Sequence, residues 1–288
     1  MRLFRTAAAA CLVFLSACAV NPPEDKRFPT SKDYPATTMG RSSFTAGGDL
    51  GWRISSLKTP SRDVAWRVVV VTGTPSWSEY WAPTLAKLPQ TREMIVADRP
   101  GFSQSEPQQA VTEIAQQARA LSPMLDGPAG QKVVLIGQSY GAPIATLMAA
   151  QHPDKVGALI LMSGFFGDRG ATAKRLMGLG AVASPLLPRD LKNAVAEVRG
   201  QTAQLPAVRE ALTGLSQPVI VLHGGRDTFV PPQAARALAE SAGARYIEVA
   251  TGDHFLNACC VDDVLGAVET AIAASEAANR GSNAVAAR

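Results

Sequence analysis

The sequence predicts an α/β fold built on a mostly parallel, doubly wound sheet. Apolar, strand-like runs alternate along the chain with longer segments of helical pattern, which is the order expected of such a sheet. One of these runs, residues 133–136, is apolar at every position, as expected of a parallel strand buried on both faces. A serine, Ser139, follows this run at its carboxyl end. These three observations predict the fold class.

The first half of the domain is expected to contribute an edge hairpin and three buried strands. Residues 40–58 alternate loosely around Gly47-Gly48-Asp49, a good hairpin turn, so two antiparallel edge strands open the domain. The buried strands and the helices between them are expected, in order, as strand 67–71, helix 79–88, strand 94–97, helix 111–125 and the strand before Ser139.

The second half is expected to contain an inserted helical cap. After a strand at 156–162, strand signals stop over about residues 164–217, and short helical patterns separated by Gly and Pro take their place. These patterns lie at 171–177, 191–198 and 206–215. Alternation then resumes with strand 218–223, helix 232–242, strand 245–249 and helix 262–277, followed by a small, polar tail at 278–288 that we expect to be flexible.

The segment 137–141 has the pattern G-x-S-x-G between the apolar strand and a helix. This pattern is typical of a nucleophile elbow, in which a serine sits in a strained backbone conformation and flanking glycines let strand and helix pass without a Cβ clash. The hydroxyl then lies at a helix N-terminus, which favours negative charge. A Gly-Ser turn between two core elements is the alternative, and the strand-turn-helix context favours the elbow.

A serine hydroxyl needs a base to remove its proton and a third group to hold that base in the correct tautomer. Asp227 lies four residues past one predicted strand and His254 lies just past the next, which gives the order Ser139, Asp227, His254. Asp227 could instead cap the following helix, and Asp253 is a rival for the acid role. The other histidines, His152 and His223, are expected to be structural.

From about residue 67 to residue 277 the sequence resembles the α/β-hydrolase family. The matching segments are DRPGFSQS (98–105), GQSYG (137–141), HPDKV (152–156), HGGRDTFVP (223–231) and GDHF (252–255). The resemblance implies a serine hydrolase with the triad named above. Two positions depart from the family: Thr72 stands where histidine is frequent, and Ser103 stands where glycine is usual.

Attack on a carbonyl creates an oxyanion that needs two preorganised donors. By the usual arrangement these are the N–H after the nucleophile and an N–H from the loop after the first buried strand, here Tyr140 and Thr74. Trp77 and Phe102, which stand close to strand ends, are candidates for lining the acyl pocket, as is Tyr140; the alternative for such aromatic residues is a place in the core.

The N-terminus has the features of a bacterial lipoprotein signal peptide over residues 1–17. Arg2 and Arg5 supply positive charge, residues 7–15 are apolar, and the run ending in Cys18 resembles a lipobox. We expect cleavage before Cys18, lipid on that cysteine, and a Pro-rich tether over 18–39 leading to the domain at 40–277. This places the protein in the cell envelope as a membrane-anchored lipoprotein, and Ala19 after the cysteine favours the outer membrane.

Net charge bears on the expected partners, and the cysteine positions bear on whether a disulfide is expected. The formal net charge of +4 gives no sign of a polyanionic partner, so no nucleic acid is expected. Cys259 and Cys260 are adjacent, about 3.8 Å apart at Cα, which is below the usual disulfide range. Two small buried thiols are therefore favoured, with a vicinal bridge left open because the compartment is oxidising.

The expected activity is cleavage of a small-molecule carboxylic ester, or less readily an amide or thioester, through an acyl-enzyme. No cofactor or metal is implied. A serine at position 139 argues against the epoxide and haloalkane hydrolases of this fold, which use an aspartate nucleophile. An acyltransferase or perhydrolase would use the same triad, and a non-catalytic envelope lipoprotein that retains the fold is the alternative from another class. The sequence does not identify the substrate.

Overall fold

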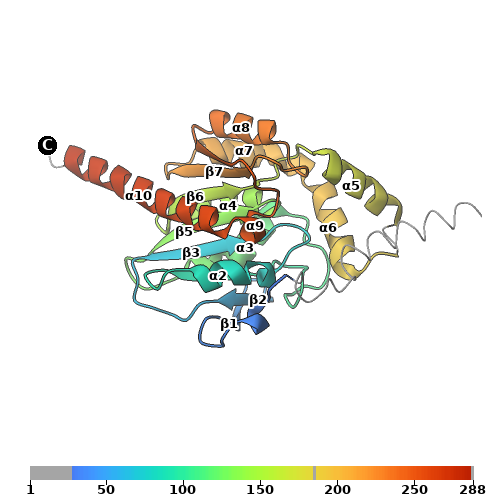
Figure 1. Ribbon diagram of the computed structural model, residues 1–288, viewed down its shortest axis with the longest axis horizontal. Helices are drawn as coiled ribbons and strands as arrows, with labels where there is room; N and C mark the ends of the chain where they lie inside the picture. Colours follow the sequence, from blue (N-terminus) through green and yellow to red (C-terminus); the bar gives the residue numbers. More distant parts are fainter. Residues whose placement is uncertain (1–27, 184–185, 287–288) are drawn as a thin grey trace, which may run out of the picture.

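The computed structural model describes residues 28–183 and 186–286 and contains one sheet of eight strands within them (Figure 1). The strand order is β1-β2-β4-β3-β5-β6-β7-β8, with β1, β2 and β4 paired antiparallel and the remaining pairs parallel. The strands are β1 (Gly40–Thr45), β2 (Arg53–Lys58), β3 (Trp66–Val71), β4 (Glu93–Ala97), β5 (Lys132–Gln138), β6 (Val156–Met162), β7 (Val219–Gly224) and β8 (Arg245–Val249). The predicted doubly wound, mostly parallel sheet is confirmed.

The strand that precedes Ser139 is central in this sheet. β5 pairs in parallel with β3 on one side and β6 on the other, with Val69 opposite Leu135 and Leu135 opposite Leu159. Its apolar side chains are needed on both faces, because Leu135 faces one hydrophobic core and Val134 the other. This double burial explains the continuous apolar run in the sequence.

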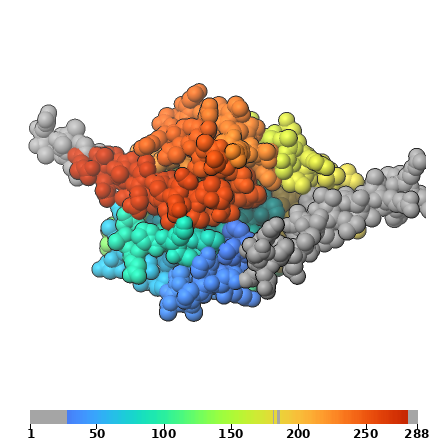
Figure 2. Space-filling model, in the orientation of Figure 1, coloured from blue at the N-terminus to red at the C-terminus, as the bar shows by residue number. Residues whose placement is uncertain are grey.

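Helices cover both faces of the sheet. One face is covered by α3 (Ile114–Leu121), α4 (Gly141–Gln151), α7 (Leu205–Thr213) and α8 (Pro232–Ser241). The other is covered by α2 (Ala82–Lys87), α9 (Leu256–Cys259) and α10 (Val261–Ala286). In Figure 2 the red α10 crosses the near side above the green segment that contains α2. Short 3₁₀ helices occur at η2 (Ser31–Asp33), η3 (Ser78–Trp81), η4 (Ser122–Leu125) and η6 (Thr202–Gln204).

The helical insertion between β6 and β7 has two parts that differ in packing. Helices α5 (Ala171–Ala183) and α6 (Arg189–Gly200) protrude at one end of the sheet (Figure 1). Helix α7 instead packs against α4, with Leu205, Val208 and Leu212 buried in the main core. The protruding part of the cap is thus the α5–α6 pair.

Two terminal segments differ from the sequence-based expectation. Residues 28–39, expected as tether, pack against the domain: Met39 is buried, and the rings of Phe28 and Tyr80 lie 5.5 Å apart. At the other end α10 continues to Ala286 where a flexible tail was expected from residue 278. Once a helix is nucleated, each further residue adds one backbone hydrogen bond, which allows the extension. The signal segment, Cys18 and residues 19–27 lie outside the described residues.

The adjacent cysteines also differ from the favoured prediction. Cys259 and Cys260 form a disulfide across a Cα separation of 3.8 Å, so the prediction of two buried thiols is wrong. Cys259 is exposed and Cys260 half-buried. The pair lies where α9 ends, and the non-helical backbone of Cys260 separates it from α10. This break leaves Cys259 at the surface, while Cys260 is only partly buried against the core. Among the described helices, none is both long enough and apolar enough to span a membrane.

Candidate active site

Ser139 occupies the tight turn between β5 and α4. Its φ of 50° lies in the left-handed region, which non-glycine residues rarely adopt and which marks a strained position. A Cβ at Gly141 would collide with the carbonyl oxygens of Val71 and Thr72, so only glycine allows β3 to approach here. This strained turn between strand and helix has the backbone geometry that the G-x-S-x-G pattern predicts.

The three predicted triad residues meet at the carboxyl ends of β5, β7 and β8. The His254 Nε2 atom lies 3.0 Å from the Ser139 Oγ, and the Nδ1 atom lies 2.8 Å from the Asp227 Oδ2. With Nδ1–H donating to the carboxylate, Nε2 is free to accept the serine proton. The hydrogen-bonded chain from carboxylate through imidazole to hydroxyl is therefore complete.

Asp227, and not Asp253, holds the histidine. The second oxygen of Asp227 accepts hydrogen bonds from the backbone N–H groups of Phe229 at 2.8 Å and Val230 at 2.9 Å. These bonds fix the carboxylate within its own loop. Asp253 is exposed and its side chain accepts a bond from the N–H of Phe255.

Two aromatic residues that the sequence analysis did not single out enclose the imidazole. Phe229 stacks on His254 with ring centroids 4.8 Å apart, and Phe255 meets it edge-on at 5.3 Å. Each is a sequence neighbour of a triad residue, within two positions of Asp227 or His254, which is the signal that could have identified them. They keep most water away from a histidine that is only 6% exposed.

His223, predicted to be structural, contacts the acid loop. Its Nε2 lies 3.1 Å from the Val230 carbonyl oxygen, to which it donates, and 3.4 Å from the Asp227 carboxylate. Burial lowers the pKa of His223, which favours the neutral form. Its Nδ1 has no hydrogen-bond partner among the described residues. His223 therefore supports the loop that carries the acid.

The candidate oxyanion residues lie on both sides of Ser139. Tyr140 follows the serine, and the loop 72–74 lies against it, because a Cβ built on Gly73 would be 2.9 Å from the Ser139 Cβ. Within the described part of the chain, the backbone N–H groups of Thr74 and Tyr140 have no backbone acceptor. Their role as donors stays a prediction.

The candidate pocket residues occupy different environments. Trp77 is half-buried and its ring lies 4.9 Å from that of Tyr80. Phe102 is fully buried, with the guanidinium of Arg99 4.7 Å above its ring. The pocket role of both stays a prediction, and the burial of Phe102 favours the core alternative.

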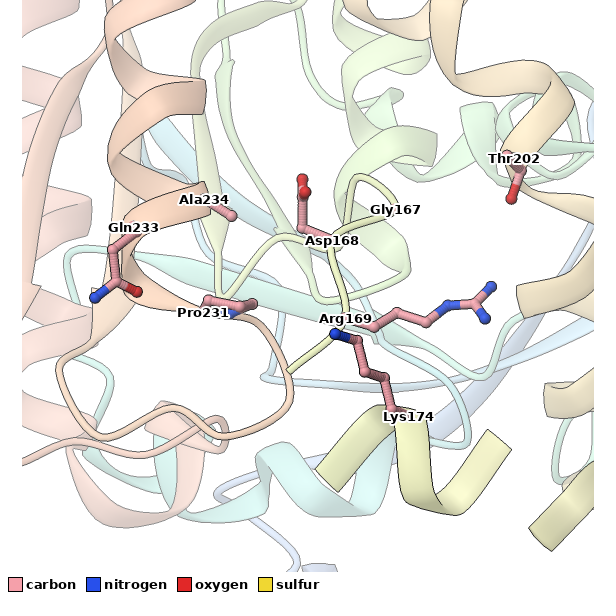
Figure 3. Close-up of a pocket in the computed structure, with 8 residues that line it drawn as sticks. All are labelled: Gly167, Asp168, Arg169, Lys174, Thr202, Pro231, Gln233 and Ala234. Carbon is pink, nitrogen blue, oxygen red and sulfur yellow. The ribbon is translucent and has the colours of Figure 1, made fainter. Parts of the chain in front are cut away.

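A pocket of about 740 Å³ lies where the start of α8 faces residues 167–169 and the cap helix α5 (Figure 3). It does not include any triad residue. Its lining mixes charged, polar and apolar residues and consists of Gly167, Asp168, Arg169, Lys174, Thr202, Pro231, Gln233 and Ala234. Among the described residues there is no group of three or more His, Cys, Asp or Glu side chains placed to hold a metal ion.

Fold and site together define a protein with the α/β-hydrolase fold, and the family description "alpha/beta hydrolase fold" matches residues 67–178. The chain is 27% identical over 221 residues to the biotin biosynthesis bifunctional protein BioHC of Teredinibacter turnerae, covering 61% of this chain and 38% of that protein. It is 25% identical over 197 residues to the pimeloyl-[acyl-carrier protein] methyl ester esterase of Vibrio campbellii, covering 56% of this chain and 76% of that enzyme. A solved thermophilic esterase from Thermogutta terrifontis superimposes with a TM-score of 0.66 at 20% identity, over 82% of this chain and 99% of the other. The structural similarity shows the fold, and the sequence similarity to the esterase supports a hydrolase activity.

Proposed function

We propose that this protein is a serine hydrolase that cleaves a carboxylic ester through an acyl-enzyme. The observation that carries the proposal is the continuous set of hydrogen bonds from Asp227 through His254 to Ser139, ending on a strained and partly exposed serine. A strained conformation maintained next to a base is typical of a functional nucleophile.

The chemistry follows from the positions of these atoms. The Ser139 Oγ attacks the ester carbonyl while His254 Nε2 takes the hydroxyl proton, and the carbonyl electrons move onto oxygen. The N–H groups of Thr74 and Tyr140 would donate to this oxyanion. His254 returns the proton to the departing alcohol, and water then repeats the sequence on the acyl-enzyme, regenerating Ser139 and releasing a carboxylic acid. Asp227 keeps Nδ1 protonated and stabilises the imidazolium throughout.

A fluorophosphonate probe tests the nucleophile directly. We expect one equivalent of label on Ser139 in the wild-type protein and none in Ser139→Ala. Ser163→Ala is the matched control, because Ser163 also has a positive φ, of 47°, at the end of the neighbouring strand β6, but its buried hydroxyl has no hydrogen-bond partner among the described residues. A protein that folds but takes no label would support the non-catalytic alternative.

The acyl acceptor separates the hydrolase from its nearest alternative. Product analysis in water, with and without added alcohol or peroxide, would show free acid as the main product of a hydrolase. Dominant transfer to the added acceptor would instead identify an acyltransferase or perhydrolase. A panel of p-nitrophenyl esters of increasing acyl length would then define the substrate class.

We also propose that Cys18 carries lipid and anchors the enzyme in the cell envelope. The support is the sequence of residues 1–18, with its positive start, apolar run and lipobox-like end. Metabolic labelling with palmitate should mark the wild-type protein and not Cys18→Ala, while Cys11→Ala should remain labelled as a control. Label retained in Cys18→Ala would refute the anchor.

A further inference from the structure

Arg99 is a fully buried cation that contacts residues 72–74, called here the oxyanion loop because it carries the candidate donor Thr74. It stands in the loop after β4, and its side chain is 0% exposed. Its Nε donates to the carbonyl oxygen of Thr72 at 2.8 Å, and one terminal nitrogen donates to the carbonyl oxygen of Gly73 at 2.8 Å. These are the two residues immediately before Thr74, so the guanidinium fixes the backbone that orients the Thr74 N–H.

The same guanidinium also contacts the other candidate donor residue. Its carbon lies 5.1 Å from the ring centroid of Tyr140 and 4.7 Å from that of Phe102, within the range of cation–π attraction. Burial raises the pKa of the Tyr140 phenol, so this ring is neutral. Arg99 thus contacts Tyr140 on one side of Ser139 and, on the other, the two residues that precede Thr74.

The charge of Arg99 is balanced by the cap. Glu197, on α6 and also fully buried, accepts bonds from both terminal nitrogens of Arg99 at 2.6 and 3.0 Å. Gln117 of α3 completes the cluster, accepting from Arg99 at 2.6 Å and donating to Glu197 at 2.7 Å. Burying an ion pair costs desolvation free energy, and a hydrophobic pair of similar volume often stabilises a protein equally well or better. This favours a role in positioning for the pair.

We propose that Arg99, held by Glu197, is a positioning residue for the oxyanion hole and couples the position of cap helix α6 to it. The proposal rests on the serine hydrolase function proposed above. A planar five-donor guanidinium can bind two backbone carbonyls and a carboxylate at once, which the ammonium of lysine cannot do in this geometry. Loss of the Arg99 guanidinium would leave the hydrogen bonds among Ser139, His254 and Asp227 intact while letting residues 72–74 shift.

The test uses Arg99→Lys and Glu197→Gln in the full-length protein. Because an oxyanion is formed only in the transition state, kcat should fall with KM nearly unchanged, by about 10²-fold for Arg99→Lys, the size of a misplaced or lost oxyanion donor. Glu197→Gln keeps the shape and one acceptor oxygen, so about a tenfold loss is expected by the same reasoning.

Asn193 provides the matched control. It lies on the same helix α6 and donates to the carbonyl oxygens of Gly101 at 2.6 Å and Gln108 at 3.0 Å, so it joins the cap to the Arg99 loop without contacting residues 72–74. Asn193→Leu should lower the melting temperature without lowering kcat. If the role of Arg99 were purely structural, Arg99→Lys and Glu197→Gln would, like Asn193→Leu, lower the melting temperature without lowering kcat.

An alkyl trifluoromethyl ketone supplies a second readout that does not depend on turnover. Ser139 adds to its carbonyl, the serine proton moves to His254, and the resulting hemiketal oxyanion occupies the hole. The inhibition constant should rise in Arg99→Lys and Glu197→Gln by the same factor by which kcat/KM falls, and stay constant in Asn193→Leu.

The outcomes separate the two proposals. A folded wild-type protein that takes no fluorophosphonate label would refute the serine hydrolase and the positioning role with it. Labelling of the wild type together with unchanged kcat and ketone affinity in folded Arg99→Lys and Glu197→Gln would refute the positioning role alone. Failure of both variants to fold, as judged by near-ultraviolet circular dichroism, would assign the pair to stability and would also overturn the positioning role.

Discussion

The two sides of this site differ in what fixes their position. The acid side, the loop of Asp227, is fixed by local hydrogen bonds, and the oxyanion side, residues 72–74, by hydrogen bonds from a distant part of the chain. On the acid side Asp227 is fixed by backbone N–H groups two and three residues further along its own loop. On the oxyanion side the carbonyls of Thr72 and Gly73 are fixed by Arg99, which in turn depends on Glu197 of the cap, 98 residues away in sequence. The base is therefore oriented locally, whereas the geometry of the oxyanion loop depends on an inserted segment.

The largest expected effects come from removing the triad itself. Ser139→Ala and His254→Ala should each lower kcat by about 10⁶-fold, with the double variant losing little more, because the residues act as a unit. Asp227→Asn should cost about 10⁴-fold, since it keeps the shape but no longer fixes the tautomer. The measurement is turnover of a p-nitrophenyl ester beside circular dichroism.

Asp253→Asn is the matched control for the acid and should keep full activity, because its carboxylate contacts the N–H of Phe255 and not the histidine. Full activity in a folded Asp227→Asn protein would contradict the local arrangement of the acid side.

A smaller effect is expected from His223, and it concerns stability. Burial holds the pKa of His223 below its ordinary value, and the titratable groups facing it are Asp227, Glu248 and His254. The unfolded chain therefore binds the proton more readily, so stability is fully present above a pH of about 6.5 and is lost as the pH falls below it.

His223→Gln should reduce this acid sensitivity, because glutamine can still donate to the Val230 carbonyl but does not titrate. Urea unfolding at pH 7.5 and pH 5 measures it: the difference in unfolding free energy between the two pH values should be smaller in the variant. An equal or larger difference would exclude His223 as the source.

The smallest expected effect lies on the oxyanion side, in the loop that carries Arg99. Ser103 has a φ of 50°, the left-handed conformation that glycine adopts without strain, which explains why glycine is usual here. Ser103→Gly should raise the free energy of unfolding by up to about 1 kcal/mol and leave kcat unchanged.

Gln104→Gly is the control in the same loop and should lower the free energy of unfolding, since it only adds freedom to the unfolded chain. Urea denaturation compares the two variants. Destabilisation by both would show that the left-handed backbone at Ser103 carries no strain.

The difference between the two sides also explains what the sequence could predict. Ser139, Asp227 and His254 each follow a segment predicted as a strand, and parallel strands bring their carboxyl ends to one edge. Their meeting was therefore predictable. Glu197 lies in a helix whose pattern shows which face is apolar but not which distant cation its carboxylate meets, so its pairing with Arg99 was not. The Cys259–Cys260 bridge was left open but not favoured, because the spacing of the two Cα atoms argues against it.

The segment that begins at residue 28 is attached to the domain close to the candidate active site. Ser31 binds Glu79 of η3 through its backbone N–H and its hydroxyl, at 2.7 and 3.0 Å, and η3 follows the loop that carries Thr74. The first described residues thus lie near the edge of the sheet that carries the candidate active site. Residues 18–27 can reach at most about 35 Å when fully extended. If Cys18 is lipidated, this short linker keeps Ser139 close to the bilayer surface. The serine would there meet substrates that partition into or leave the lipid.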